Sequence, residues 1–423
     1  MALEILAIGD LHLGRTPIGL PDGFAPRDFS PRAAWARAVE HAIEQRVDAV
    51  VVLGDVVDHD DDFIEAYDPL KHGVERLVRA EIEVLAVVGN HDVRVLPRLA
   101  SEIGELRLLG RGGVWEEHRV EREGRGAVRF VGWSFPTKTV KHDPVESLTL
   151  RAEDGVATIG LVHGDLDDAS SNYAPLARAR LVAKRFDAWL LGHVHKPSLG
   201  GDRDRIGYLG SLVGLDPGEP GLHGPWRVRV DGPGRVHYEP LALAPIRWES
   251  AELLVTPEMD ADAAQAMFVR AIEALRVASD REWGEAKLVA VRLSVVGSTR
   301  RSADILGRLR EGLGQPIGAA PTFFLEAVLD RTRPDRDLAA LAATDHPAAG
   351  LARRLLALQG AGDSAERERL IHAARGAIEP VRGKACFAEL GATAPADAEL
   401  AELLVQEGRE LLELLLAPEG GAA

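Results

Sequence analysis

The feature that most constrains this chain is the alternation of short apolar segments with helix-like segments up to about residue 92. The apolar segments are "LEILAIG" (3–9), "VDAVVVLG" (47–54) and "IEVLAVVG" (82–89), and helical patterns occupy 35–45 and 74–80 between them. Strands that are apolar throughout, instead of at every second position, are typical of a parallel sheet buried on both faces. We therefore predict an α/β fold.

Each of these strands is followed by polar residues. In an extended chain, residues two apart point to the same side, so Asp10 and His12 can reach one point beyond the first strand. Taken alone, such a pair is more often a turn beside a surface histidine. The second and third strands are followed by Asp55 and Asp58 in "GDVVD" and by Asn90, His91 and Asp92 in "GNHD".

Two later apolar segments repeat the arrangement, because "VATIGLVHGD" contains His163 and "FDAWLLGHVH" ends in His193 and His195. Each cluster alone has a structural explanation, such as a turn or a hydrogen-bonded core histidine. Five clusters in order, each closing an apolar strand, are poorly explained as independent accidents. Carboxylate, amide and imidazole groups together suit manganese, iron or zinc. We therefore predict a metal centre at the carboxyl ends of the strands, where open α/β sheets bind ligands.

Composition restricts the partners. The net charge of −16 repels nucleic acid and anionic membranes, so a phosphate-bearing substrate needs a local cationic feature such as metal ions. Cys386 is the only cysteine, which excludes an internal disulfide and a Cys-rich zinc site. The sequence has no basic segment before its first strand and no run of about 18 apolar residues. We expect a cytoplasmic protein that does not enter a membrane.

The chain of 423 residues is long enough for two or three domains. Strand-like pieces continue from about 108 to 243, and the first domain is expected to span 1–245. Residues 246–335 alternate strand and helix and predict a small α/β domain. Residues 336–423 predict a helical region.

The series GDLHLG, GDVVD, GNHD, VHGD and GHVH resembles the calcineurin-like metallophosphoesterase superfamily, whose fold is a β-sandwich flanked by helices around a two-metal centre. This resemblance covers about residues 1–245. "GDLHLG", "YLGSL" and "GEPGLHG" are more specifically similar to the nuclease subunit of SbcCD-type DNA repair complexes, including YhaO-like proteins. "VAVRLSVVGSTR" is similar to the DNA-binding capping domain of that subunit.

The resemblance implies two divalent metal ions, with manganese expected and magnesium, iron or zinc as alternatives. Two cations about 3.5–4 Å apart can clamp phosphate oxygens, and a metal-bound water loses its proton near neutral pH. The implied ligands are Asp10, His12, Asp55 and His195 for one metal and Asp55, Asn90, His163 and His193 for the other, with Asp55 bridging.

The resemblance also makes His91 the group that stabilises the transition state and protonates the leaving oxygen. Asp58 resembles the acid that orients such a histidine, although it can also be read as a solvated loop carboxylate. The acidic run "HDDDFIEAYD" follows it and would repel DNA if it lined the substrate groove. Basic residues in nearby loops could offset this charge by contacting phosphates, or could simply be solvent-exposed; they are Arg15, Lys138, Lys141 and Lys196.

Three hypotheses follow. The first is a DNA exonuclease of the SbcD type with DNA and an SMC-like ATPase as partners, for which a homodimer is an option. The second is a small-molecule or nucleotide phosphoesterase, and the third is a scaffold with a vestigial metal centre, against which His91 argues. The last predicted helix, from Asp397 to Leu416, has a broad apolar surface that would pack on the two preceding helices or offer one side to the ATPase.

Overall fold

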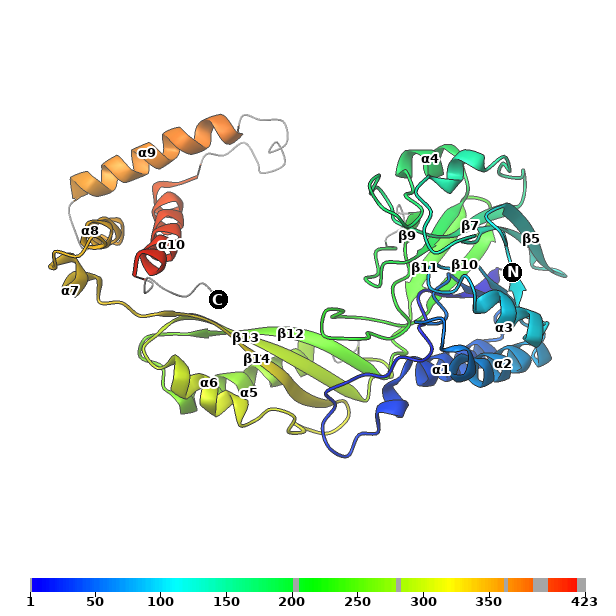
Figure 1. The fold of residues 1–423 in the computed structure, drawn as a ribbon, viewed down its shortest axis with the longest axis horizontal. Helices are drawn as coiled ribbons and strands as arrows, with labels where there is room; N and C mark the ends of the chain where they lie inside the picture. The colour runs from blue at the N-terminus through cyan, green and yellow to red at the C-terminus, as the bar shows by residue number, and fades with distance from the viewer. Residues whose placement is uncertain (1, 201–204, 279–282, 361–363, 383–394, 417–423) are drawn as a thin grey trace. The chain divides into compact units, whose positions relative to one another are not determined.

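The protein has a mixed α/β fold, described by a computed structural model for residues 2–200, 205–278, 283–360, 364–382 and 395–416 (Figure 1). The chain divides into two compact units, Met1–Thr332 and Arg333–Ala423. The predicted regions 1–245 and 246–335 both fall almost entirely within the first unit, so the boundary between them stays a prediction. Cys386 lies outside the described residues.

A six-stranded sheet contains the first three predicted strands, and its strand order is β11-β10-β1-β2-β3-β4. Neighbours from β1 to β4 are parallel, as predicted, whereas β10 and β11 add antiparallel strands beyond β1. Its strands are β1 (Leu3–Ile8), β2 (Ala49–Val52), β3 (Glu83–Ala86), β4 (Arg107–Leu108), β10 (Trp226–Gly232) and β11 (Arg235–Pro240).

A second sheet has five strands in the order β5-β6-β7-β8-β9. Its strands from β6 to β9 run parallel, and β5 pairs antiparallel with β6. The strands are β5 (Trp115–Arg122), β6 (Gly126–Trp133), β7 (Ala157–His163), β8 (Ala188–Gly192) and β9 (Ile206–Tyr208).

The two sheets form a sandwich flanked by helices, which confirms the predicted fold class. In β1, Leu3, Ile5 and Ala7 belong to the core between the sheets, whereas Leu6 and Ile8 pack beneath the helices. Burying one such Leu or Ile side chain contributes about 1.5–3 kcal/mol. The continuous apolar character of the strands is thus explained, because both of their faces are covered.

The helices of this region lie on opposite sides of the sandwich, with α1 and α2 below it and α4 above it in Figure 1. Helix α1 begins after Ser30, whose hydroxyl accepts a hydrogen bond from the Ala33 amide at 3.4 Å, and Pro31 takes its first position. The helices are η1 (Pro26–Phe29), α1 (Pro31–Gln45), α2 (Phe63–Arg79), α3 (Leu96–Ile103), η2 (Pro144–Ser147) and α4 (Arg178–Ala183).

Helix α2 begins at Phe63, well before the predicted start at 74. The first turns of α2 were not predicted from the sequence because Pro69 lies inside the helix, where proline is normally unfavourable. The indole Nε1 of Trp35 in α1 donates to the Pro69 carbonyl at 2.9 Å and so fastens the two helices together.

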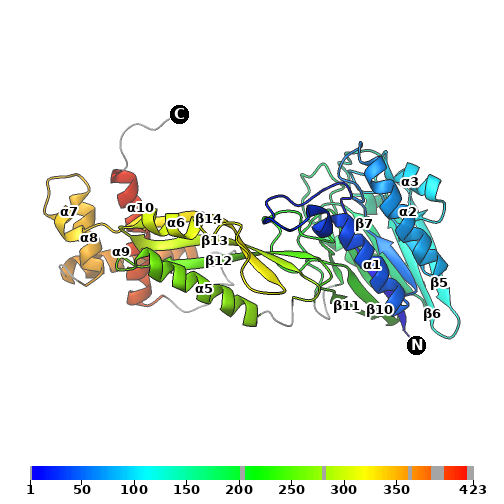
Figure 2. The same cartoon turned by 90° about the horizontal axis from the view of Figure 1, so that it is seen from below.

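A three-stranded sheet follows, with β12 (Ile246–Val255), β13 (Leu288–Thr299) and β14 (Thr322–Pro334) in that order. Helices α5 (Ala261–Ala278) and α6 (Ser302–Arg310) lie on one face of it, as Figures 1 and 2 both show. On the other face, Trp248, Leu288, Ala290 and Phe324 join the core beneath α1. The predicted strand and helix order is confirmed.

The second unit contains α7 (Leu338–Ala342), α8 (Ala349–Leu358), α9 (Ser364–Arg382) and α10 (Asp397–Leu416). Leu400 and Leu412 of α10 are buried in two small cores shared with α8 and α9. Leu411 and Leu414 are 50% and 74% exposed, so α10 buries only part of its apolar surface. Neither α10 nor any other helix in the described ranges is long and apolar enough to cross a membrane.

Candidate metal centre

The predicted site residues follow adjacent parallel strands at one edge of the sandwich. In the six-stranded sheet, β1, β2 and β3 are neighbours, and in the other sheet β7 and β8 are neighbours. Their parallel registers align the strand ends, so the loops that follow meet each other. The amides of Leu11 and His12 both donate to the Asp55 carbonyl, at 3.0 and 2.8 Å, which fastens the first two loops together.

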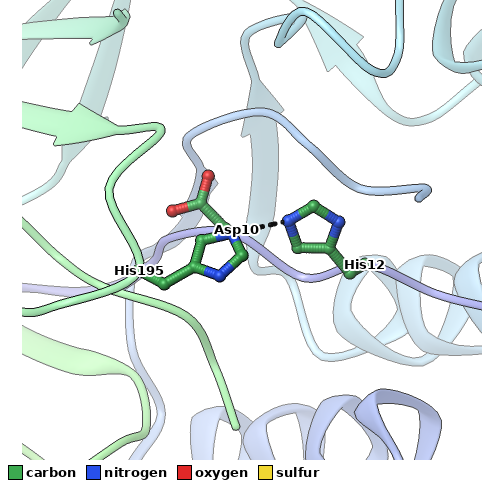
Figure 3. A group of neighbouring side chains, drawn as sticks. All are labelled: Asp10, His12 and His195. Carbon is green, nitrogen blue, oxygen red and sulfur yellow. Dashed lines mark hydrogen bonds between the residues drawn. The ribbon is translucent and has the colours of Figure 1, made fainter. Parts of the chain in front are cut away.

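Asp10, His12 and His195 form a first group whose potential ligand atoms all lie within 4.8 Å of one another. Figure 3 shows the two imidazole rings with their edges toward each other beside the carboxylate, and their Nε2 atoms are 2.9 Å apart. Asp10 Oδ1 accepts a hydrogen bond from the His193 amide, but Oδ2 is buried without a partner. An unsatisfied carboxylate oxygen beside two converging nitrogens fits a divalent cation.

Asp55, His163 and His193 form a second group that meets the same distance limit of 4.8 Å. The Asn90 Oδ1 atom lies 3.0 Å from His163 Nε2 and 3.1 Å from His193 Nδ1, so the predicted fourth member is also in place. Asp55 Oδ2 lies 3.3 Å from His163 Nε2. The structure therefore brings together all seven predicted ligands, whose role in metal binding stays a prediction.

The second group is strongly polarised even without metal. Burial disfavours the charge of Asp55, but the charge and hydrogen bond of His163 outweigh burial and hold the pKa of Asp55 well below its usual range. Burial also lowers the pKa of His163, but the carboxylates of Asp55 and Asp10 raise it to about 9. A proton on His163 would have to leave before its inner nitrogen could bind a cation.

Each of the four histidines in the two groups has an acceptor near its outer nitrogen. Such contacts select the tautomer and leave the inner nitrogen free for a metal. The pairs are His12 Nδ1 with Asp58 Oδ1 at 2.9 Å, His195 Nδ1 with Glu219 Oε1 at 2.6 Å, His163 Nδ1 with the Leu53 carbonyl at 2.8 Å, and His193 Nε2 with Asp165 Oδ2 at 3.3 Å. The sequence analysis did not identify Glu219, Leu53 or Asp165.

The loops that carry the ligands are bent, in contrast to the extended geometry expected for Asp10 and His12. His12, Asp55 and His193 have positive φ angles of 47°, 45° and 108°. Such conformations cost on the order of 1–3 kcal/mol each in a non-glycine residue and concentrate at functional sites. The packing is equally tight at Gly89, where an added Cβ would lie 2.1 Å from Asp55 Oδ1.

Asp92, to which the sequence analysis gave no separate role, ties two of these loops together. Its buried carboxylate accepts hydrogen bonds from the amides of Val56, Val57 and Gly89, at 3.1, 3.0 and 3.2 Å. Burial and the nearby charge of Asp55 raise the pKa of Asp92 to about 6. This residue fixes the loop of Asp55 against the loop of Asn90.

His91 lies at the rim of the centre with its side chain 38% exposed. Its amide donates to Asp55 Oδ1 at 3.0 Å, and its Nε2 lies 4.0 Å from Asp55 Oδ2. Its Nδ1 donates to the backbone carbonyl of Asp58 at 2.6 Å.

The role of the Asp58 carboxylate in orienting His91 stays a prediction, and the contacts of this residue divide between its carboxylate and its carbonyl. That carboxylate lies against His12 and against His59 Nε2 at 3.2 Å, and the hydrogen bond from His12 lowers its pKa. The loop turns so that only the Asp58 carbonyl reaches His91.

The predicted substrate contacts lie on loops and differ in their surroundings. Arg15 is 3.9 Å from Asp216, and Lys138 forms a 2.8 Å ion pair with Asp60 in the acidic run. Lys141 and Lys196 are exposed. Lys138 therefore neutralises part of the charge of the acidic run.

Tyr173 is an exposed aromatic residue that the sequence analysis missed. Its ring centroid lies 5.3 Å from that of His193, and the residue is 38% exposed. A tyrosine so far from the strand-end motifs in sequence carries no local signal of this position.

Comparisons with known proteins give a family match and two curated relatives. The sequence profile of the calcineurin-like phosphoesterase family matches residues 3–197. The uncharacterized metallophosphoesterase YhaO of Bacillus subtilis (strain 168) is 28% identical over 261 residues, which are 60% of this chain and 64% of YhaO. The DNA double-strand break repair protein Mre11 of Methanopyrus kandleri is 24% identical over 208 residues, which are 46% of this chain and 45% of Mre11.

The chain therefore spans less than two thirds of the length of these two relatives. Among solved structures, a dimetal phosphatase from Danio rerio is 15% identical, with 54% of this chain and 92% of that chain covered and a TM-score of 0.34. The family match concerns residues 3–197 and rests on the sequence profile.

Proposed function

Residues 3–197 form a calcineurin-like phosphoesterase domain, and from that premise we propose that the protein is a two-metal phosphodiesterase that cleaves DNA as part of an SbcCD-like repair complex. The observation that carries the hydrolytic part is the convergence of two separate histidine and carboxylate groups at one edge of the sandwich. Metal-binding hydrolysis is the property of the family; DNA as the substrate is our proposal.

The donor set favours a borderline metal. The two groups offer four imidazoles together with carboxylate and amide oxygens, whereas magnesium prefers oxygen ligands alone. We propose manganese, with iron or zinc next and magnesium last. When bound, the two cations would clamp phosphate oxygens and lower the pKa of an attacking water.

His91 supplies the proton that the leaving oxygen needs. Its Nδ1 must carry a proton to donate to the Asp58 carbonyl, so Nε2 is the nitrogen that faces the centre. In the imidazolium form, the Nε2 proton passes to the leaving alkoxide, and Nε2 then keeps the lone pair. The exposed side chain allows the next proton to come from solvent.

The support for DNA is the likeness to a protein whose name describes DNA double-strand break repair. Tyr173 beside His193 also offers a ring on which a base could stack. We further propose that residues 246–335 act as a domain that shapes the substrate groove and that the protein works in the cytoplasm. A small-molecule or nucleotide phosphoesterase is the second candidate, because the acidic run reduces the positive charge that DNA requires.

One assay separates the two candidates. The purified full chain with Mn²⁺ is tested on linear single- and double-stranded DNA beside a bis-phenyl phosphodiester, with Asp55→Ala protein as the inactive control. Cleavage of DNA by the wild type alone supports the nuclease. Rapid turnover of the small ester without any cut in DNA, with or without a candidate ATPase, would favour the second candidate.

We propose that α10 provides the contact for an SMC-like ATPase. Truncation after Pro395 would remove α10, but it would also expose the cores that Leu400 and Leu412 share with α8 and α9. Leu411→Glu and Leu414→Glu are sharper changes, because both leucines are already exposed, and Gln406→Glu adds the same charge at an exposed polar position. We expect only the leucine variants to lose co-purification with the ATPase; retention by both would place the contact elsewhere.

A further inference from the structure

The loop between β9 and β10 carries a carboxylate that touches the metal centre. Glu219 Oε1 accepts a hydrogen bond from His195 Nδ1 at 2.6 Å, although the two residues are 24 positions apart. Glu219 Oε2 accepts two more, from the Ser211 hydroxyl and from the Leu215 amide, both at 2.9 Å. Both oxygens of this side chain are therefore fixed.

The backbone around Glu219 is also held from within the loop. His223 is buried, and its Nε2 lies 3.1 Å from the Glu219 carbonyl oxygen. Its Nδ1 lies 3.0 Å from the Ser211 hydroxyl, which itself donates to Glu219. Ser211, Glu219 and His223 thus form a closed set of contacts behind His195.

A residue from the three-stranded sheet clamps the same loop on both sides of Glu219. Trp248 of β12 is buried, and its indole Nε1 donates to the Gly214 carbonyl at 2.9 Å. Its own carbonyl accepts a hydrogen bond from the Gly221 amide at 2.8 Å. The approach is close, because a Cβ added at Gly214 would lie 2.8 Å from Trp248 Cδ1.

We propose that Glu219 is a positioning residue for the metal that Asp10, His12 and His195 would hold, and that Trp248 keeps the loop of Glu219 in place. The inference rests on the proposed two-metal centre and deepens it. The His195 Nδ1 proton is directed to Glu219, so the Nε2 lone pair faces His12 Nε2. A carboxylate behind a ligating histidine fixes its orientation and raises its basicity.

The proposal is specific for one of the two positions. In the other, the outer nitrogen of His163 donates to the Leu53 carbonyl, which belongs to the backbone after β2 and not to the loop of Glu219. Loss of the Glu219 carboxylate should therefore weaken one metal and leave the other unchanged. A general loss of folding would weaken both.

The test is a titration of the full chain with Mn²⁺. Binding is measured by isothermal titration calorimetry and by the electron paramagnetic resonance of manganese. In Glu219→Gln we expect one of the two sites to weaken by roughly 10–100-fold, the usual effect of removing an outer carboxylate. Asp216→Asn is the matched control, because Asp216 lies on the same loop and contacts Arg15 and the Gly218 amide instead of His195. Its two sites should bind as in the wild type.

Two sites of wild-type affinity in Glu219→Gln would overturn the positioning role, and equal weakening of both would overturn its specificity. Trp248→Phe keeps a ring but removes the donor to Gly214, and it should weaken the same single site by a smaller factor. If Trp248→Phe binds both metals as the wild type does while Glu219→Gln binds one of them more weakly, the role of Trp248 is contradicted and that of Glu219 stands. A wild type that binds no manganese would instead contradict the proposed function.

Discussion

The two halves of the candidate metal centre are built differently. In the group of Asp10, His12 and His195, both histidines contact carboxylates from loops, those of Asp58 and Glu219. In the other group, His193 Nε2 also lies near a loop carboxylate, that of Asp165 at 3.3 Å, but the fully buried His163 ends strand β7 and contacts a backbone carbonyl.

Both histidines of the first position thus contact loop carboxylates, whereas one of the two histidines of the second position contacts the backbone that follows a strand. A carboxylate on a loop can be removed by a single substitution, whereas the Leu53 carbonyl remains whatever side chain that residue carries. We therefore expect a carboxylate substitution to weaken the first position through either of its histidines, and the second position only through His193. Asp55 and His91 contact parts of both and allow the comparison to be tested.

The largest effect is expected for Asp55→Ala, which should remove the metal from both positions and so leave no difference between them. The Asp55 carboxylate lies 3.3 Å from His163 in the second group, whereas the Asp55 carbonyl that accepts from the His12 amide is retained in alanine. If its carboxylate also bridges the metals, its loss leaves two cations without the charge between them. Metal analysis after gel filtration is the measurement, with the exposed Asp61→Ala as control. Two metals at wild-type affinity in Asp55→Ala would exclude the bridge.

His91→Ala should leave both positions intact and so separate metal binding from catalysis. His91 contacts Asp55 through its backbone amide, which alanine retains. We expect normal metal content with turnover of a phosphodiester reduced by roughly 10²–10⁴-fold, the usual contribution of a general acid. Parallel loss of metal and activity would make His91 a ligand, and full activity would remove its catalytic role.

Asp58→Asn should lower the metal affinity of the first position and leave that of the second position unchanged. The substitution removes the charge beside His12 but keeps the backbone carbonyl that accepts from His91. We expect roughly 10–100-fold weaker binding of one metal in a manganese titration. Should both metals bind normally while turnover falls, the Asp58 carboxylate would have a catalytic role that its contacts do not indicate.

The smallest effect concerns pH. A metal ligand must be a neutral imidazole, and His163 holds its proton up to a pKa of about 9 in the metal-free protein. Binding at the second position therefore displaces a proton, and its affinity should rise by about tenfold per pH unit up to that pKa and fall as pH decreases. Proton release on adding Mn²⁺ in weak buffer at pH 7.5 checks this. Absence of release would contradict the protonated state of His163.

Much of the architecture was predictable because the strands carry their own signal. The continuous apolar character of β1, β2 and β3 indicated burial on both faces, and the polar residues after them indicated the site. The start of α2 was missed because Pro69 interrupts its pattern, and the contact of His91 with the Asp58 carbonyl was not predicted.

The sequence alone indicated which strand ends carry the site, because parallel strands in register bring their carboxyl ends to one edge within each sheet. The packing of the two sheets against each other and the groups behind each ligand depend on the tertiary structure. Glu219 reaches His195 across 24 residues, and Trp248 reaches Gly214 across 34. Such contacts leave no periodic trace in the sequence, because they depend on how loops close in space and on strained residues such as His12 and His193, whose backbone conformations the surrounding fold imposes.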